Sequence, residues 1–320
     1  MMHLRLIAPD DVSGSLRDRL VDDPCVTNVV FLPGTALSPA GDVLHCDVTR
    51  EAVADVLDLV RGAGLYERGA VALSTVDAAP SANAARTERS APGAPDDALV
   101  WDQVLDQANG EVRGSWSYYV FLTLATLIAS VAVITDSSVL VVGAMVVGPE
   151  FAAVSALALG VVLLDLRLSG RALRLLVQGF AVAVLVAAAL ALLGRVTGVI
   201  TLEDVTGPRP LTGFIWRPDL WSAVVALLAG TAGVLSQTAG KTNALVGVFI
   251  SVTTVPAAGD LALSLAFGQP TQLAGSAAQL GINLVGMLVA GVLTLLVQRA
   301  LWATVRKRRR AAQRGATGTG

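Results

Sequence analysis

The stretch VVGAMVVGPEFAAVSALALG, residues 141–160, is apolar enough to lie inside a lipid bilayer, yet it carries Gly148, Pro149 and Glu150 side by side at its middle. Proline lacks the backbone donor of a helix and its ring clashes with the preceding turn, so it frees carbonyl groups that lipid cannot satisfy. The stretch therefore predicts a membrane span that is broken at Pro149, with the break facing protein or water.

The composition of the whole chain agrees with a membrane protein. Hydrophobic residues make up 54% of the 320 residues, and the mean hydropathy is +0.66. Charged residues make up only 15%, against roughly 25% in soluble domains. Residues 1–111 hold 18 acids and 8 bases, whereas residues 112–320 hold 7 acids and 15 bases. An acidic soluble part is therefore expected before a basic membrane part.

The first twenty residues contain no long apolar run of a secretory signal and reach acids at Asp10 and Asp11. We therefore expect the N-terminal part to stay in the cytoplasm. The two cysteines of the chain, Cys25 and Cys46, both lie in this part. A reducing compartment makes free thiols the expectation for both, rather than a disulfide or a metal site.

Residues 1–78 predict a small α+β domain. Strands are expected at 3–8, 26–32, 42–48 and 69–76, and helices at 10–23 and 49–65. This order is that of a ferredoxin-like sandwich, which places both helices on one face of an antiparallel sheet. His45 and Cys46 are neighbours in a strand and point to opposite faces, which argues against a shared metal. We expect His3 and His45 to be ordinary residues of the sheet.

Three further segments connect or follow the domains. Residues 79–99 are rich in Ala, Pro and Ser without an apolar period, and they predict a flexible linker. Residues 100–115 predict an amphipathic helix that approaches the membrane. Residues 304–320 predict a disordered tail whose basic residues suit an anionic inner leaflet. Nucleic-acid binding by this tail is the weaker interpretation.

Residues 116–303 predict a membrane domain with six crossings, each of about 20 apolar residues. The candidate spans are 116–134, 138–164, 172–193, 220–239, 243–267 and 279–303. With six crossings, most Arg and Lys residues of the connections fall on one side of the membrane. The positive-inside bias then places the N- and C-termini in the cytoplasm.

Two of these spans, 138–164 and 243–267, are longer than a crossing needs and share a pattern. Each runs through Leu-Val and Gly, breaks at Pro149 or Pro256, and ends in an Ala/Leu-rich turn before a glycine. With three spans in each half, the second half enters from the opposite side. Such inverted repeats with broken helices are typical of transporters, whose binding sites lie near the breaks. Chance similarity is the alternative, because Ala, Leu, Val and Gly dominate both halves.

A Gly-Ala-Met stretch that runs into a proline, followed later by Leu-Val-Gly-Val and a second proline, resembles the hallmark of the domain-of-unknown-function 389 (DUF389) family of bacterial membrane proteins. The matching residues here are Gly143, Ala144, Met145 and Pro149, then Leu245, Val246, Gly247, Val248 and Pro256. The resemblance covers the membrane part and, more loosely, the soluble domain. It implies a place in the bacterial inner (plasma) membrane and brings no established activity. Glu150 departs from the small or apolar residue expected there, so its role rests on physical chemistry.

Ionisable groups at membrane depth are the first candidates for a site, because each costs at least about 2.5 kcal/mol on insertion scales. Glu150 and Asp260 rank first on this ground. If Pro149 is the first residue of a new half-helix, Glu150 lies in its first turn, where the helix dipole favours a carboxylate. If the two repeats cross at their breaks, both carboxylates approach one cavity that binds a cation or carries a proton. The alternative is that the prolines only kink two long helices.

The other candidates surround the two breaks. Thr253 and Thr254 precede the second proline and can bond to freed backbone groups. The predicted substrate or ion site comprises Glu150, Asp260, Pro149, Pro256, Thr253, Thr254, Gly148 and Asn283, with Asp136 and Lys241 joining Asn283 as a second tier near the mouths or the interior. Gly230 with Gly233, and Gly286 with Ala290, are instead expected to bring helices together, because small residues allow close approach.

Paired broken spans with acids predict a secondary transporter or channel-like permease for a small ion or solute, with a cytoplasmic regulatory domain. The alternative is a non-transporting receptor or scaffold whose N-terminal domain binds a ligand or partner and whose spans assemble a homo-oligomer. The expected partners are the lipid bilayer and the small ion or solute, with no nucleic acid and no cofactor. We expect no enzyme, no catalytic residue and no metal ligand, because the sequence has no Gly-x-Ser-x-Gly elbow, no phosphate loop and no histidine after His45.

Overall fold

The computed structural model describes residues 1–91, 100–239 and 252–317, with side chains up to residue 304. The chain divides into two compact units. The first unit comprises Met1–Gln103 with Gln298–Gly320, and the second comprises Val104–Val297. Each unit is described by itself.

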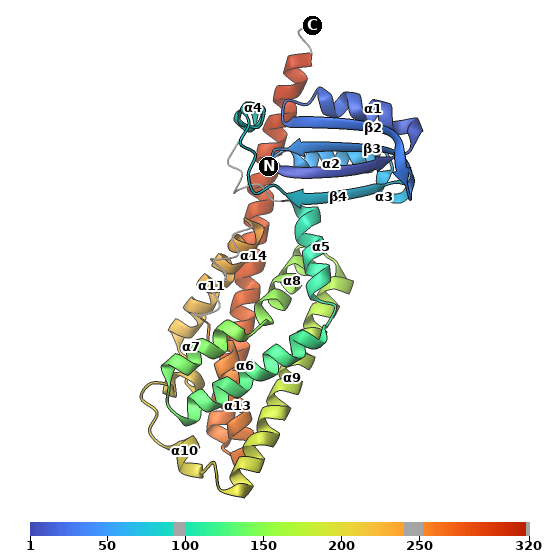
Figure 1. Ribbon diagram of the computed structural model, residues 1–320. Coiled ribbons are helices and arrows are strands. Elements are labelled where there is room, and N and C mark those ends of the chain that lie inside the picture. Colours follow the sequence, from blue (N-terminus) through green and yellow to red (C-terminus); the bar gives the residue numbers. More distant parts are fainter. Residues whose placement is uncertain (92–99, 240–251, 318–320) are drawn as a thin grey trace. The chain divides into compact units, whose positions relative to one another are not determined.

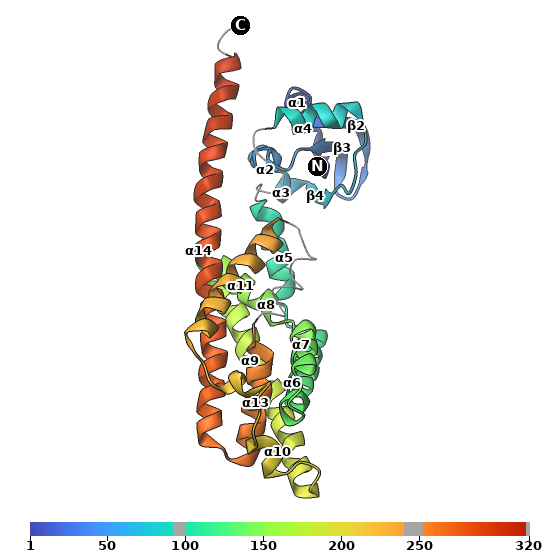
Figure 2. The same cartoon turned by 90° about the vertical axis from the view of Figure 1, so that its left-hand side faces the viewer.

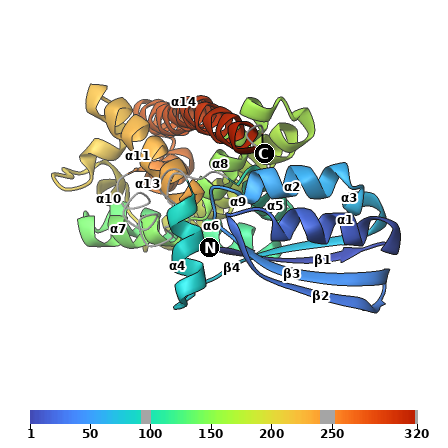
Figure 3. The same cartoon turned by 90° about the horizontal axis from the view of Figure 1, so that it is seen from above.

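The N-terminal unit is built on a four-stranded sheet, whose strands lie side by side in Figure 1. Its strands are β1 (Met2–Ala8), β2 (Val26–Leu37), β3 (Ala40–Val48) and β4 (Ala70–Thr75). They lie in the order β2-β3-β1-β4, and each neighbouring pair is antiparallel. The helices α1 (Asp10–Val21), α2 (Val53–Gly62) and the short α3 (Leu65–Arg68) lie on one face of the sheet (Figure 3). The predicted order of strands and helices is therefore found.

The core of this unit lies between the sheet and its helices. Alternate residues of β1 are buried, beginning at Met2, which is the two-residue period of a strand with one covered face. Leu16 and Leu20 of α1 are buried against them. Cys25 and Cys46 are both buried in this core, and neither forms a disulfide within the described residues. Burial, with a smaller effect of the Asp47 charge, raises the pKa of the Cys46 thiol to about 12, so this thiol is unreactive at neutral pH.

The opposite face of the sheet carries a cluster of polar side chains. The rings of His3 and His45 stack with their centroids 5.3 Å apart. The Nδ1 atom of His3 lies 2.7 Å from Oδ1 of Asp47, and its Nε2 atom lies 3.1 Å from Nδ1 of His45. The two histidines bond to each other and to Asp47 on this face, and Cys46 points to the other side as predicted.

Two segments that were predicted to be irregular are helical in part. Within the linker 79–99, residues Ala82–Ser90 form α4, and the hydroxyl of Ser81 accepts a hydrogen bond from the backbone of Ala84. This N-cap and the alanines of the segment favour a helix. The tail is helical as far as Thr317, because Ala, Lys and Arg are good helix formers and continue the preceding helix. The helix α5 (Trp101–Glu111) occupies most of the predicted approach segment.

The second unit is helical. Its long helices are α6 (Trp116–Ile134), α9 (Leu166–Thr197), α11 (Leu220–Thr238) and the part of α14 (Pro270–Thr317) that ends at Val297. Its shorter elements are α7 (Ser138–Val147), α8 (Glu150–Leu163), α10 (Leu202–Thr206), the 3-10 helix η2 (Gly213–Trp216) and α13 (Thr254–Phe267). The four long helices are long and apolar enough to cross a membrane, and α7 with α8 makes a fifth span if the bent pair is counted as one. The predicted fifth span, 243–267, lies partly outside the described residues, so the number six stays a prediction.

The predicted break is present between α7 and α8, where the helix axis bends by 51°. Gly148 ends α7 and Pro149 precedes α8 as its N-cap, so the first helical residue is Glu150 and not the proline. The helix thus begins one residue later than predicted, which has little energetic effect. A backbone N–H at either position would have no partner inside the helix, and proline has no N–H to leave unbonded. Pro256 lies in the first turn of α13, where a proline is tolerated for the same reason.

Small residues bring the helices of this unit together. A side-chain carbon on Gly230 of α11 would lie 2.6 Å from the backbone oxygen of Met287 in α14, and one on Gly286 would lie 2.8 Å from Cβ of Ala226. A carbon on Gly233 would enter the ring of Phe151. The predicted packing role of these glycines is confirmed, and Figure 2 shows α11 and α14 side by side.

Candidate functional site

The starts of the two half-helices α8 and α13 lie against each other. A side-chain carbon on Gly148 would come within 2.7 Å of Cγ2 of Val255, in the first turn of α13, and would also meet the carboxylate of Glu150. Only a glycine therefore fits at this point of the break. The predicted meeting of the two breaks is found at the level of these residues.

Both half-helices are too short to cross a membrane alone. Each contains 14 residues. At a rise of 1.5 Å per residue this is about 21 Å, against roughly 30 Å for the hydrocarbon layer. A half-helix that ends at a membrane surface therefore begins inside the apolar layer. Its first backbone N–H groups need partners other than its own carbonyls.

Glu150 occupies the start of α8 as a buried residue that is 8% exposed. Among the described residues, its Oε2 atom has no hydrogen-bond partner. The phenol oxygen of Tyr118, which interacts electrostatically with Glu150, and the hydroxyl of Thr254 are likewise buried without a partner in the described part of the chain. Around Glu150 and at the start of α13 there are thus polar atoms that the described side chains leave unsatisfied, which is the environment of a bound ion, proton or water.

A second polar cluster lies where α13 begins. The hydroxyl oxygen of Thr253 accepts hydrogen bonds from Nε2 of Gln279 at 3.1 Å and from Nδ2 of Asn283 at 3.2 Å. Gln279 also donates to Oδ1 of Asn283 at 3.3 Å. The two amides are 2% and 1% exposed, and Oε1 of Gln279 has no partner among the described residues. Thr253 and Asn283, both predicted, are therefore brought together, and Gln279 is added to them.

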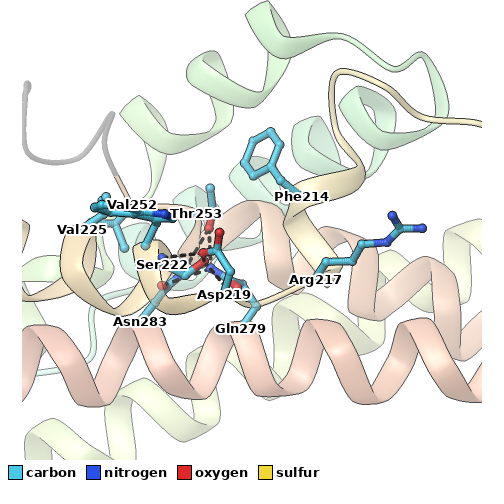
Figure 4. A pocket seen from close by; sticks show the side chains of 10 residues that line it. Phe214, Arg217, Asp219, Ser222, Val225, Val252, Thr253, Gln279 and Asn283 are labelled. Carbon is cyan, nitrogen blue, oxygen red and sulfur yellow. Dashed lines mark hydrogen bonds between the residues drawn. The ribbon is translucent and has the colours of Figure 1, made fainter.

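This cluster forms the floor of a pocket of about 250 Å³. The pocket is lined by Phe214, Arg217, Asp219, Trp221, Ser222, Val225, Val252, Thr253, Gln279 and Asn283. Figure 4 shows Asp219 and Ser222 beside the Thr253 cluster, with Arg217 extending away from it. We call this space the half-helix pocket. Hydrogen bonds from the backbone and the hydroxyl of Ser222 lower the pKa of Asp219, so the pocket keeps a carboxylate at its entrance.

The charge of Asp260, the second predicted carboxylate, is balanced by Arg209, outside the half-helix pocket. Its Oδ1 atom lies 2.6 Å from Nη1 of Arg209, and its Oδ2 atom accepts a hydrogen bond from Ser276 at 2.5 Å. The side chains of Asp260 and Arg209 are 0% and 5% exposed, so this is a buried ion pair. Within the described residues no hydrogen bond joins Asp260 to Glu150. These contacts of Asp260 do not include the predicted cavity that it would share with Glu150.

Of the other two second-tier candidates, Asp136 has structural partners and Lys241 lies outside the described residues. Asp136 accepts hydrogen bonds from the backbone N–H groups of Leu211 and Thr212 and from the Thr212 hydroxyl. It therefore holds the connection between α10 and α11 instead of facing an ion. Lys241 and the predicted Leu-Val-Gly-Val motif, 245–248, lie outside the described residues.

Ser276 and Gln279 were not among the predicted site residues, but together with the predicted Asn283 they have a signal in the sequence. Ser276, Gln279 and Asn283 follow one another at spacings of three and four residues, which places them on one face of α14. A polar stripe in an otherwise apolar helix marks the face that turns away from lipid. Arg209 has no such signal, because it pairs with Asp260 across 51 positions.

Comparison with known proteins shows what this part of the chain is similar to. The family model described as "Domain of unknown function (DUF389)" matches residues 145–289, a range that contains both half-helices and the half-helix pocket. An uncharacterized protein of Methanocaldococcus jannaschii is 21% identical over 194 residues, which are 61% of this chain and 58% of the relative. No solved structure matches the chain. The match leaves out the soluble domain, and the resemblance of the membrane part to the DUF389 family is confirmed for residues 145–289.

Proposed function

We propose that the chain is a secondary transporter or channel-like permease for a small ion or solute. The observation that carries the proposal is the half-helix pocket, where Thr253, Gln279 and Asn283 meet at the start of a helix too short to cross a membrane. Polar side chains inside a bilayer are costly, and they occur where they face a pathway or one another. A set that lines an open pocket, and whose buried Gln279 amide oxygen has no partner among the described residues, favours the pathway.

The arrangement of the half-helices supports the same proposal. In transporters with inverted repeats, half-helices begin near the middle of the bilayer and present their N–H groups to the solute. Here α8 and α13 have equal length and begin beside each other. We propose that they are equivalent elements of a three-plus-three inverted repeat with six spans. The distribution of Arg and Lys supports a bacterial plasma-membrane protein with both termini in the cytoplasm.

Within this proposal the two carboxylates have different roles. Glu150 carries an oxygen without a described partner at the break, so it is the residue that binds the coupling cation or proton. Asp260 already has Arg209 and Ser276 as partners, so it holds the outer connection to α13 in place. The solute then binds in the half-helix pocket, where Thr253 and Asn283 contact it.

The N-terminal unit is proposed to be a ferredoxin-like regulatory domain. The strand order and the helices on one face are those of this fold. Its other face carries the His3, His45 and Asp47 cluster, which offers a surface for a regulatory ligand. This cluster is also the observation that favours the alternative, a membrane receptor whose N-terminal unit binds the ligand and whose spans transport nothing.

Reconstituted vesicles test the proposal. Full-length protein is placed in proteoliposomes, and protein-dependent currents and internal pH are followed while small sodium and potassium salts, amines, carboxylates and phosphate are added. We expect a saturable response to at least one solute, which Asn283→Leu removes. Thr294→Val is the matched control, because Thr294 lies on the same helix and its hydroxyl, within the described residues, donates to the carbonyl of Ala290 in its own helix. A response to no solute, or one that Asn283→Leu leaves unchanged, contradicts the proposal.

Cysteine labelling separates transport from the receptor alternative without a known solute. Single cysteines replace Thr253 or Leu293 in a chain whose two native cysteines are changed to alanine. A membrane-impermeant thiol reagent should label the cysteine at 253 and not the one at 293, which faces lipid or a neighbouring chain at 56% exposure. If position 253 resists the reagent from both sides of the membrane, no water-filled path reaches the pocket, and the receptor interpretation is favoured.

A further inference from the structure

A second pocket lies beside the half-helix pocket, in the connection between α10 and α11. It measures about 530 Å³ and is lined by Thr206, Gly207, Pro208, Arg209, Pro210, Gly213, Trp216, Arg217 and Gln272. We call it the arginine pocket. Arg217 lines both pockets, so the two spaces meet at this side chain.

The arginine pocket is positively charged. Two guanidinium groups line it, and its described lining residues include no carboxylate. The nearby acids have other partners: Asp260 bonds to Nη1 of Arg209, Asp136 bonds to the backbone at 211 and 212, Asp204 caps α10 through Thr201, and Asp219 caps α11 through Ser222. Glu203 of α10 is exposed. Among the described residues, Arg209 is paired with an acid and no ion pair is formed by Arg217, so the charge of Arg217 remains for a ligand.

The pocket also holds buried polar atoms that lack a partner. The Arg209 side chain is 5% exposed, and its Nη2 atom has no hydrogen-bond acceptor among the described residues. The amide oxygen of Gln272 is also buried without a partner in the described part of the chain, but it is an acceptor and needs a donor instead of an anion. A buried donor without an acceptor costs about 1–3 kcal/mol, and more when the group is charged. An oxygen of a bound anion at Arg209 would remove this cost.

The side chain of Arg217 is already positioned for binding. Its guanidinium carbon lies 4.4 Å from the centroid of the Trp216 ring. Stacking holds a guanidinium plane while leaving its N–H edge available, and this edge matches the two oxygens of a carboxylate or phosphate. Trp216 thereby reduces the number of orientations that Arg217 must lose when it binds.

We infer that the arginine pocket binds a small soluble oxyanion, a carboxylate or phosphate, through Arg217 and Nη2 of Arg209. The inference rests on the proposed function in one respect: it makes the solute of the half-helix pocket an anion that is first held at Arg217. Binding at equilibrium does not require transport, so the two ideas fail separately.

Purified full-length protein in nanodiscs of phosphatidylcholine tests the inference. Thermal unfolding is followed while sodium phosphate or sodium acetate replaces sodium chloride at constant ionic strength. We expect the unfolding midpoint to rise in a saturable way with at least one of the two anions, because a ligand that binds only the folded state stabilises it. The affinity should fall roughly tenfold or more in Arg217→Gln, as expected for a lost charge-assisted hydrogen bond. The affinity of Arg217→Lys should lie between those of the unchanged protein and Arg217→Gln. Lysine keeps the positive charge but lacks the two parallel N–H groups of the guanidinium.

Arg174→Gln is the matched control, since Arg174 is an exposed arginine of α9 outside both pockets. A repeat in nanodiscs with phosphatidylglycerol distinguishes a lipid headgroup from a soluble anion. If anionic lipid alone protects the protein and phosphate does not compete, the soluble oxyanion is refuted. No protection by either anion, or equal protection of Arg217→Gln, also overturns the inference. If the protein binds the anion but shows no flux, the oxyanion inference stands and the transport proposal is refuted. If it shows flux but binds no anion, the transport proposal stands and the oxyanion inference is refuted.

Discussion

Removing Arg209 alone is expected to destabilise the membrane unit more than removing Arg209 and Asp260 together. Their atoms lie 2.6 Å apart, and their side chains are 5% and 0% exposed, so water screens the pair little. Arg209→Met leaves the Asp260 carboxylate buried with Ser276 as its remaining described partner. Loss of one member of a buried pair costs about 3–5 kcal/mol. We expect a loss of this size in the free energy of unfolding.

The double variant Arg209→Met, Asp260→Leu removes both charges. Replacement of a buried pair by apolar residues of similar volume is often neutral or stabilising. The Ser276 hydroxyl then loses its acceptor, at a cost of about 1–3 kcal/mol. The double variant should therefore unfold within about 2 kcal/mol of the unchanged protein. The coupling between the two sites should lie near or above the upper end of the usual range of about 0.5–3 kcal/mol.

The assay is denaturant unfolding of full-length protein in detergent micelles, with all four members of the cycle measured together. Ser264→Ala on the same helix is a control, because the Ser264 hydroxyl is buried without a described partner, and its loss removes no hydrogen bond seen in the structure. Additive single and double effects would refute the reasoning. So would an Asp260→Asn variant that keeps full stability and loses ion-linked uptake, because that outcome makes Asp260 an ion ligand and not a structural anchor.

The remaining predictions concern the break, the packing glycines and the N-terminal unit. Glu150→Gln should leave expression and elution on size exclusion unchanged and abolish ion- or proton-linked uptake in proteoliposomes; unchanged uptake makes Glu150 a packing residue. Gly230→Ala should cost about 1–3 kcal/mol in unfolding experiments, because its new carbon meets the Met287 backbone, whereas Gly170→Ala meets nothing within 4 Å and should cost nothing. A fragment of residues 1–103 should unfold cooperatively and at higher temperature than 1–78, because Ala84 of α4 is buried and Val100 belongs to the core. Hydrogen bonds from the Ser13 hydroxyl and then the Gly34 backbone lower the pKa of Asp42, so its stabilisation is complete above the ordinary value near 3.8 and is lost as the pH falls through the lowered pKa. Asp42→Asn in the 1–103 fragment should therefore flatten the loss of stability below about pH 4, and equal acid sensitivity of both proteins would argue against it.

The features that sequence predicted are those with a local cause. The break at Gly148 and Pro149 follows from the chemistry of proline in lipid, and the position of Glu150 in the first turn follows from the break. The order of strands and helices in the N-terminal unit follows from periods of two and of about four in its apolar residues. Each signal lies within one element, so neighbouring residues suffice to reveal it.

The features that sequence did not predict depend on contacts between distant segments. Arg209 belongs to a loop of mixed charge, and only the fold brings it to Asp260. Asp219 has the position of an ordinary helix cap, and its place at the pocket entrance depends on α13 and α14 lying beside α11. The described partners of Asp260 are Arg209 and Ser276, because a carboxylate one turn inside α13 has different neighbours from one at the start of α8. A cavity shared by the acids of both breaks stays a prediction.

The contacts at the two breaks also explain why a membrane segment places a helix breaker beside a carboxylate. Pro149 removes a donor at a point where the helix start would leave it unbonded, so the break costs less there than in mid-helix. Gly148 gives the room in which Val255 and the Glu150 carboxylate both approach the backbone. The dipole of α8 then stabilises the charge of Glu150, while burial opposes that charge. Because a cation, a proton or water changes the balance between these two effects, we propose that occupancy of this position alters the contact between α8 and α13, and with it the half-helix pocket that begins at Thr253.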